Sequence, residues 1–402
     1  MPRNRISTSS RSSRETERLV RLALALNAST SRPEERYWEH QLETLMLRLL
    51  RTGNDAALEA AFERLTGNEP GAYEVLLEMA ESLSESTLVE HDGKRYDVLL
   101  VALPFAVWTR YSIPQGPIRP DIVDVLRGRL AEHVLASNVQ IALLPHLLSI
   151  DHMPRSFSAT YQWLQRLGAQ VTGKHGSVEL PPAEVPMNML ADTRYIAAAV
   201  AVPEGGPMFA WQEHPSDPTY SRTACQSRWE EHVRTVMGEL LPGCGVEILL
   251  PDAWFAANRA ADRRVRALSI GAAVAWLDSV ANLPPDSLRA VIAGCGENQI
   301  DEYRIGITRR NSNEVIYGCV WPLFGPDDTP APSDRLDAPL DVQDEIAMLF
   351  KEQGVTDIRR IPGILPPEFC EDCGSPYFPD PTGEMVHVEL PEEAEQAPTH
   401  FH

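Results

Sequence analysis

The chain has 402 residues and the composition of an ordinary globular protein, with 43% hydrophobic and 23% charged residues. Its formal net charge of -21 repels phosphate backbones, which argues against a nucleic-acid-binding function. No apolar run reaches the roughly 18 residues of a membrane-spanning helix, and the Arg- and Ser-rich start lacks the apolar segment of a secretory signal. We therefore expect a cytoplasmic protein of two or three domains that binds neither nucleic acid nor membrane.

The N-terminal part predicts a tail followed by helices. Residues 1–14 contain four arginines, no acidic residue and almost nothing apolar, which predicts a disordered basic tail. Residues 15–90 have the periodicity of four helices, and the second of them has Pro33 in its first turn and Gly53 just past its end. This pattern is typical of helical hairpins, and because two hairpins are too few to stand alone, we expect the module to pack on the rest of the chain. One outer groove of it could hold a partner protein.

The middle of the chain contains an internal repeat. The strings "RYDVLLVALP" (95–104) and "RYIAAAVAVP" (194–203) share an Arg-Tyr start, an apolar run and a final Pro. Each is followed by an amphipathic helix and by a second apolar run that ends in "LLP". Apolar runs separated by helices indicate buried strands covered by helices. We predict an α/β fold with a mixed sheet, built from duplicated βαβ-type units over residues 91–190 and 191–285.

The C-terminal third predicts one more unit and a tail. Residues 286–365 contain "IDEYRIGITRRNSNEVIYGCVWP", which is typical of an antiparallel hairpin that turns at "NSN". A helix over "DVQDEIAMLFKEQG" and a strand over "VTDIRRIPG" are expected to complete this third, strand-rich unit. Residues 366–402 form an acidic tail that has nine Asp and Glu residues but no Lys or Arg.

Three strings of the sequence carry a resemblance to a known family. They are "WTRYSIPQGPI", "MPRSFSATYQWLQRLG", and the ending from "FCEDCGSPYFPDPTGEMVHVELPEE" to "HFH". The chain resembles, from about residue 17 to its end, the proteobacterial family called domain of unknown function 2863. The resemblance implies a bacterial cytoplasmic protein, and it implies no activity, substrate or catalytic residue.

The sharpest local signal is the turn "CEDCG", which contains Cys370 and Cys373. Such a Cys-x-x-Cys-Gly turn supplies half of a tetrahedral zinc site, because its glycine permits the left-handed backbone that the turn needs. The sequence has no second Cys-x-x-Cys, so we expect His400 and His402 as the remaining ligands, with His387 as a substitute. The prediction is a closed, structural zinc site that holds a zinc-knuckle-like tail.

Two alternatives remain open for the cysteine pair, namely ordinary reduced thiols and a redox-active pair. The redox interpretation is less favoured because the motif does not open a helix after a strand. In addition, no cationic residue lies nearby in the sequence to stabilise a thiolate.

A second candidate site lies in the turns after the repeated strands. Arg110, His152, Arg155 and Asp252 occupy these turns, and open α/β sheets bind ligands just beyond the carboxyl ends of their strands. If the two units face each other, these side chains line a cleft that suits a small anionic metabolite. Ion pairs on solvated loops are the alternative explanation.

The sequence contains no complete catalytic motif, so whether the protein is an enzyme stays open. The leading hypothesis is a non-catalytic regulatory or interaction protein with an unknown protein partner and a structural zinc. The alternative is an enzyme or binding protein for a small anionic metabolite, which would occupy the cleft between the two units.

Overall fold

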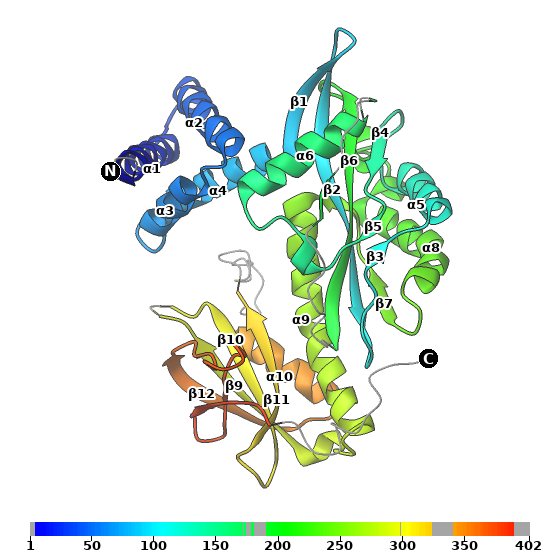
Figure 1. Ribbon diagram of the computed structural model, residues 1–402. Coiled ribbons are helices and arrows are strands. Elements are labelled where there is room, and N and C mark those ends of the chain that lie inside the picture. Colours follow the sequence, from blue (N-terminus) through cyan, green and yellow to red (C-terminus); the bar gives the residue numbers. More distant parts are fainter. Residues whose placement is uncertain are drawn as a thin grey trace.

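The computed structural model describes residues 5–171, 173, 178–180, 190–297, 299–323 and 341–389, and the side chains from residue 14 onward. These residues form an N-terminal helical module, a central sheet with helices on both faces, and a smaller second sheet (Figure 1). The fold class is mixed helix and sheet, as the sequence predicts. No helix in the described ranges combines the length and the apolar character needed to cross a bilayer.

Four helices make up the N-terminal module, and their leucines and alanines form a core of their own. Their bounds are α1 (Arg5–Asn27), α2 (Arg32–Thr52), α3 (Asp55–Leu65) and α4 (Pro70–Glu85). Helix α2 ends where the sequence predicts, because Gly53 adopts a left-handed conformation (φ +66°) and its N–H donates to the last carbonyls of the helix. Helix α1 begins at Arg5, so it includes residues that the sequence placed in a disordered tail.

The central sheet has the strand order β1-β2-β6-β4, with β7 and β8 also beside β2. Its strands are β1 (Ser86–His91), β2 (Lys94–Trp108), β4 (Gln140–Leu143), β6 (Ala191–Pro203), β7 (Gly245–Ile248) and β8 (Asp252–Ala253). Every pairing in this sheet is antiparallel, so the prediction of a mixed sheet is wrong for these two units. Strand β4 belongs to the first predicted unit but pairs with β6 of the second unit. Strand β7 belongs to the second unit but pairs with β2 of the first.

The two repeated strings of the sequence lie side by side as the long strands β2 and β6. Tyr96 lies opposite Pro203, Pro104 lies opposite Tyr195, and Leu100 lies opposite Ala199 in the middle. This register is the one expected if the two strands are related by a two-fold axis. The outer strands do not follow this symmetry. Strand β1 pairs with the first half of β2, and β7 pairs with β2 only after that half.

Helices cover both faces of the central sheet. Side chains alternate along β2, so Leu103 and Phe105 pack against α5 (Pro120–His133) and α8 (Arg222–Leu240). Leu100 points to the other face, toward α6 (Phe157–Val171) and the first half of α9 (Trp254–Ser279). The predicted buried strands covered by helices are therefore confirmed. The connections contain β3 (Gly116–Pro117), β5 (His146–Leu147), α7 (Ala210–Glu213) and the 3-10 turns Ile150–His152, Pro218–Tyr220 and Pro285–Ser287.

The second sheet has the order β11-β10-β9-β12 and is mixed. Its strands are β9 (Leu288–Cys295), β10 (Glu302–Arg309), β11 (Val315–Pro322) and β12 (Asp357–Leu365). The predicted hairpin forms between β10 and β11, whereas β12 runs parallel to β9. Helix α10 (Val342–Glu352) and the second half of α9 pack on one face of this sheet.

The C-terminal segment lies on the opposite face of the second sheet. It contains β13 (Phe378–Pro379) and β14 (Met385–Val386), and it approaches the strands where they have glycine. A Cβ atom at Gly306 would lie 2.2 Å from the carbonyl oxygen of Pro379, and one at Gly318 would lie 2.4 Å from the ring of Phe378. Glycine is therefore required at both positions for this close packing.

Helix α9 joins the two sheets. Its 26 residues span about 39 Å at a rise of about 1.5 Å per residue. Trp254 and Ala261 in its first half pack on the central sheet, whereas Ile270 and Leu277 in its second half belong to the core of the second sheet. Helix α9 therefore contributes to both cores. The predicted boundary near residue 285 assigns all of α9 to the unit before it, although the second half of α9 packs with the second sheet.

Candidate metal centre

The predicted knuckle is a tight turn at the surface of the second sheet. The turn is closed at its base by a bridge between Phe369 and Pro376. Inside it, the Cys370 N–H donates to the Ser375 carbonyl at 2.8 Å, and the Gly374 N–H donates to the Cys370 carbonyl at 2.9 Å. Gly374 has a φ of +71°, which is the left-handed conformation expected for the glycine of this motif.

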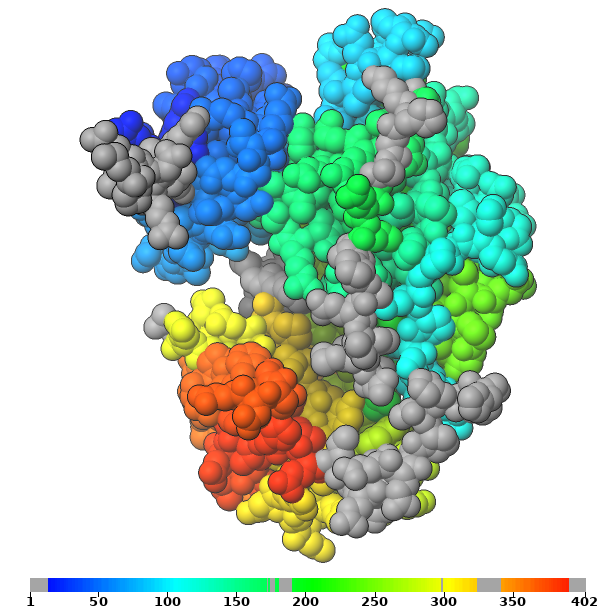
Figure 2. Space-filling view, viewed as in Figure 1, coloured from blue at the N-terminus to red at the C-terminus, as the bar shows by residue number. Residues whose placement is uncertain are grey.

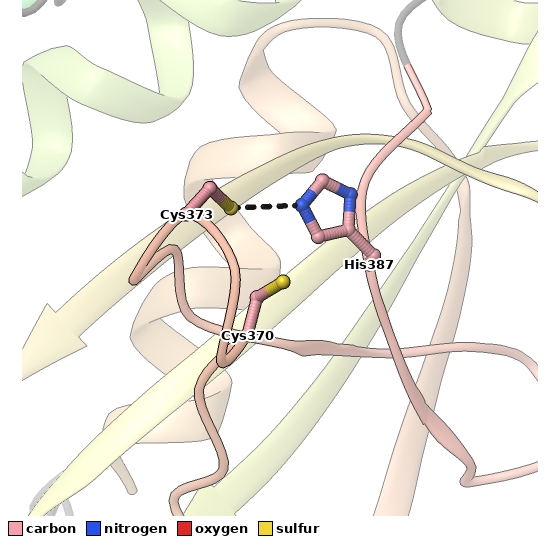
Figure 3. Close-up of side chains that lie close together, drawn as sticks. All are labelled: Cys370, Cys373 and His387. Carbon is pink, nitrogen blue, oxygen red and sulfur yellow. Dashed lines mark hydrogen bonds between the residues drawn. The ribbon is translucent and has the colours of Figure 1, made fainter.

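His387 follows β14 and brings its ring to the two cysteines (Figure 3). Its Nε2 lies 3.3 Å from the Sγ of Cys373, and its Nδ1 lies 2.8 Å from the carbonyl oxygen of Val388. A carbonyl only accepts hydrogen bonds, so Nδ1 carries a proton, and in the neutral ring Nε2 presents its lone pair to the sulfur atoms. This is the tautomer that a metal-binding histidine needs.

The ligand atoms of Cys370, Cys373 and His387 all lie within 4.8 Å of one another. In a tetrahedral zinc site, with bonds of about 2.3 Å to sulfur and 2.0 Å to nitrogen, the ligand atoms lie about 3.5 Å apart. The three residues therefore fit a zinc ion with little movement. His387, the substitute ligand in the sequence prediction, is the histidine beside the cysteines, and His400 and His402 lie outside the described residues.

The surroundings of the cluster favour the thiolate form that binds metals. Hydrogen bonds to Cys373, first from Ser375 and then from the protonated ring of His387, lower the pKa of its thiol to about 6. The same hydrogen bond to Cys373 raises the pKa of His387. Zinc sites built from cysteine and histidine bind the metal through thiolates and imidazoles, and both groups lie next to each other here.

A buried arginine anchors the turn to the sheet beneath it. Arg304 lies in β10 and is fully buried, and its Nη1 donates to the carbonyls of Glu368 and Tyr377, the latter at 2.9 Å. Its Nε donates to the carboxylate of Glu302 at 2.6 Å, and its guanidinium lies 4.7 Å from the ring centroid of Phe369. Because Glu368 and Tyr377 flank the turn, Arg304 holds both of its ends.

Reasoning from sequence missed Arg304, although a signal for it exists. A charged residue inside an apolar strand such as "YRIGIT" is rare unless it has partners. That signal indicates a buried arginine but not which segment satisfies it, because its carbonyl partners lie more than sixty residues along the chain.

A family model described as "Protein of unknown function (DUF2863)" matches residues 4–401, which is nearly the whole chain. The chain belongs to the DUF2863 family. The resemblance carried by the three sequence strings is thereby confirmed. No curated protein and no solved structure matches the chain.

The structure places the four residues of the predicted cleft of this DUF2863 protein in separate surroundings. The Arg110 Nε donates to the Tyr111 hydroxyl at 2.9 Å, and buried His152 lies 3.1 Å from the Ser149 hydroxyl through its Nδ1. Arg155 forms an ion pair with Asp151, and Asp252 forms one with Arg222. Within the described ranges, no hydrogen bond or ion pair joins any two of the four residues.

Arg155 faces the helical module. It lines a hollow of about 270 Å³ between the helical module and α6, together with Phe62, Phe157 and Phe255. This hollow is mostly apolar, and the helical module and both predicted units contribute to its lining, the second unit through Phe255. The ligand-binding role of Arg155 in a cleft between the two units stays a prediction.

Proposed function

We propose that this DUF2863 protein is a cytoplasmic, non-catalytic interaction or regulatory protein whose C-terminal segment is held by a structural zinc ion. The observation that carries the zinc site is the convergence of Cys370, Cys373 and His387 within 4.8 Å on a turn anchored by Arg304. The zinc-knuckle-like tail of the sequence prediction is part of this proposal.

The ligand types support zinc over other metals. Two thiolates and an imidazole suit zinc, whereas calcium and magnesium prefer oxygen ligands. We assign the fourth position to His400 or His402 of the tail, as the sequence predicts. Four protein ligands would leave no position for a reactive water, so the ion would serve stability rather than catalysis.

A metal would add stability where the segment has little core of its own. Residues 366–389 contribute Phe378 to the buried side chains, but most of their other residues are partly or fully exposed. Binding free energy at such a site is free energy of folding, because the ligands converge only when the segment is folded. The zinc would therefore keep the segment on the second sheet.

The test is the metal content of the full chain purified without a histidine tag. We expect about one zinc per chain in the wild type and its loss in the Cys370→Ser/Cys373→Ser variant. The matched control is Cys244→Ser, a partly exposed cysteine outside the cluster, which should retain the zinc. Absence of zinc from the wild type, even after incubation with zinc under reducing conditions, would overturn the proposal.

The lowered pKa of Cys373 favours a second candidate, a redox-active pair of Cys370 and Cys373. Thiol titration separates the two. A mild oxidant removes two thiols reversibly in a redox pair, whereas a bound zinc ion protects both until a chelator releases it. The enzyme or binding protein for a small anionic metabolite stays a prediction, and a thermal-shift screen with acidic metabolites tests it.

We also infer that residues 91–190 and 191–285 are two copies of one βαβ-type unit. The register of β2 with β6 supports this inference, since Tyr96 and Tyr195 lie opposite the corresponding prolines, Pro203 and Pro104. Each unit would place its second strand beside the first strand of the other, so neither is expected to fold alone. Expression of each unit separately tests this, and a stable isolated unit would contradict it.

A further inference from the structure

A large hollow lies on the helical module, between α2, α4 and the connection from α1 to α2. Its volume is about 700 Å³, and its apolar lining consists of Leu26, Val75, Met79 and Leu83. The module forms a blue lobe at the side of the molecule (Figure 2). This hollow does not belong to the metal site, which lies on the second sheet.

Carboxylates line both sides of the hollow. Glu35, Glu39 and Glu43 follow one another at four-residue spacing along α2, and Glu78 stands on α4. Residues four apart lie on one face of a helix, about 6 Å from each other along the axis. Among the described residues, one ion pair involves any of these four carboxylates. It joins Glu43 to His40 at 3.8 Å.

A second hollow of about 550 Å³ continues the first, because Glu43 and Leu83 line both. It extends to the edge strand β1, where Leu88 is 43% exposed. The two hollows together form a groove, which we name the α2/α4 groove, and polar atoms line more of it than apolar ones do. Its floor consists of partly buried apolar side chains, and the more exposed glutamates form an acidic rim. Arg32 and Arg51 also line it, one in each hollow.

We propose that the α2/α4 groove binds a basic amphipathic helix of a partner protein. A helix fits between two helices, and an apolar stripe on it would cover the floor while Lys or Arg at four-residue spacing would face the glutamates of α2. The net charge of -21 would steer a basic partner toward this surface and repel nucleic acid or anionic lipid.

The chain's own basic segment fits the groove poorly. Residues 1–14 carry arginines but lack an apolar stripe, since Ile6 is their only large apolar residue besides Met1. An external helix is therefore the better match to a groove that is apolar at its floor. The proposal names the partner class for the interaction role proposed above, on which it rests, but it does not depend on zinc.

The test uses a designed, fluorescently labelled helix of about 18 residues with a leucine stripe flanked by lysines. Its binding to the full chain is measured by fluorescence anisotropy at physiological salt. We expect Glu35→Lys/Glu39→Lys to weaken binding by about tenfold or more. The matched control is Glu63→Lys/Glu74→Lys, which changes the net charge equally at exposed positions of the same module outside the groove.

Two further arms decide what the groove recognises. A peptide with serine in place of leucine should bind at least about tenfold more weakly, because it cannot cover the floor. The Cys370→Ser/Cys373→Ser variant should bind as the wild type does, so that failure of the zinc site and failure of the groove are told apart. Circular dichroism shows whether each variant keeps its fold.

Three results would overturn the proposal. Equal losses in the groove and control variants would indicate attraction by bulk charge, and undiminished binding by the groove variant would place the peptide elsewhere. Self-association of the wild type that is abolished by Glu35→Lys/Glu39→Lys would show that a second copy of the chain fills the groove.

Discussion

Replacement of Glu85 by glutamine should stabilise the protein at alkaline pH and not at acidic pH. Glu85 ends α4, and its carboxylate accepts a hydrogen bond of 2.9 Å from the Phe255 N–H in the first turn of α9. Burial raises the pKa of this carboxyl to about 7, against the lowering effect of the Phe255 hydrogen bond, and the negative charge of Glu81 raises it further.

The size of the effect follows from the shift of the pKa from 4.5 to about 7. The folded state binds the proton more tightly than the unfolded state, so the free energy of unfolding decreases as the pH rises from about 4.5 to about 7. A shift of this size corresponds to about 3 kcal/mol as an upper value. The amide of the Glu85→Gln variant would keep an acceptor for the Phe255 N–H but would have no charge to bury.

Urea unfolding followed by circular dichroism, at about pH 5 and about pH 8, measures the difference between Glu85→Gln and the wild type. We expect near-equal stability at the lower pH and a gain of up to about 3 kcal/mol in the variant at the higher pH. Glu74→Gln on the exposed side of the same helix controls for the loss of one charge. The reasoning is refuted if the difference is the same at both pH values, or if the variant is less stable at the higher one.

Three further predictions concern the C-terminal segment. Arg304→Ala leaves two carbonyls and a carboxylate without their donor, and urea unfolding should show a loss of at least about 3 kcal/mol; an unchanged midpoint would exclude the anchor. Gly306→Ala should detach the C-terminal segment from the second sheet, so limited proteolysis should cleave that segment faster. Gly238→Ala, with open space around its Cβ position, should not change the rate of cleavage. A chelator should lower the melting temperature of the wild type but not of Cys370→Ser/Cys373→Ser, and equal melting shifts would count against a bound metal.

Much of the local structure follows from the sequence by itself. Pro33 and Gly53 mark the ends of a helix because their backbone preferences are local. The apolar runs of β2 and β6 predict buried strands, and the "CEDCG" string predicts a tight turn, since each depends on residues that are neighbours along the chain. The sequence therefore predicted the long helices and strands, the combination of helix and sheet, and the cysteine pair of the candidate metal site, but not the start of α1 at Arg5.

Only the tertiary structure decided how these elements meet. The pairing of β4 with β6, the double role of α9, and the place of Asp252 opposite Ala102 depend on contacts between distant segments, which no local pattern specifies. The same holds for the place of His387 beside the cysteines and for Arg304 beneath their turn. Periodicity tells which face of an element is buried, but burial is non-directional, so the partner that covers each face is chosen by the packing of the whole chain.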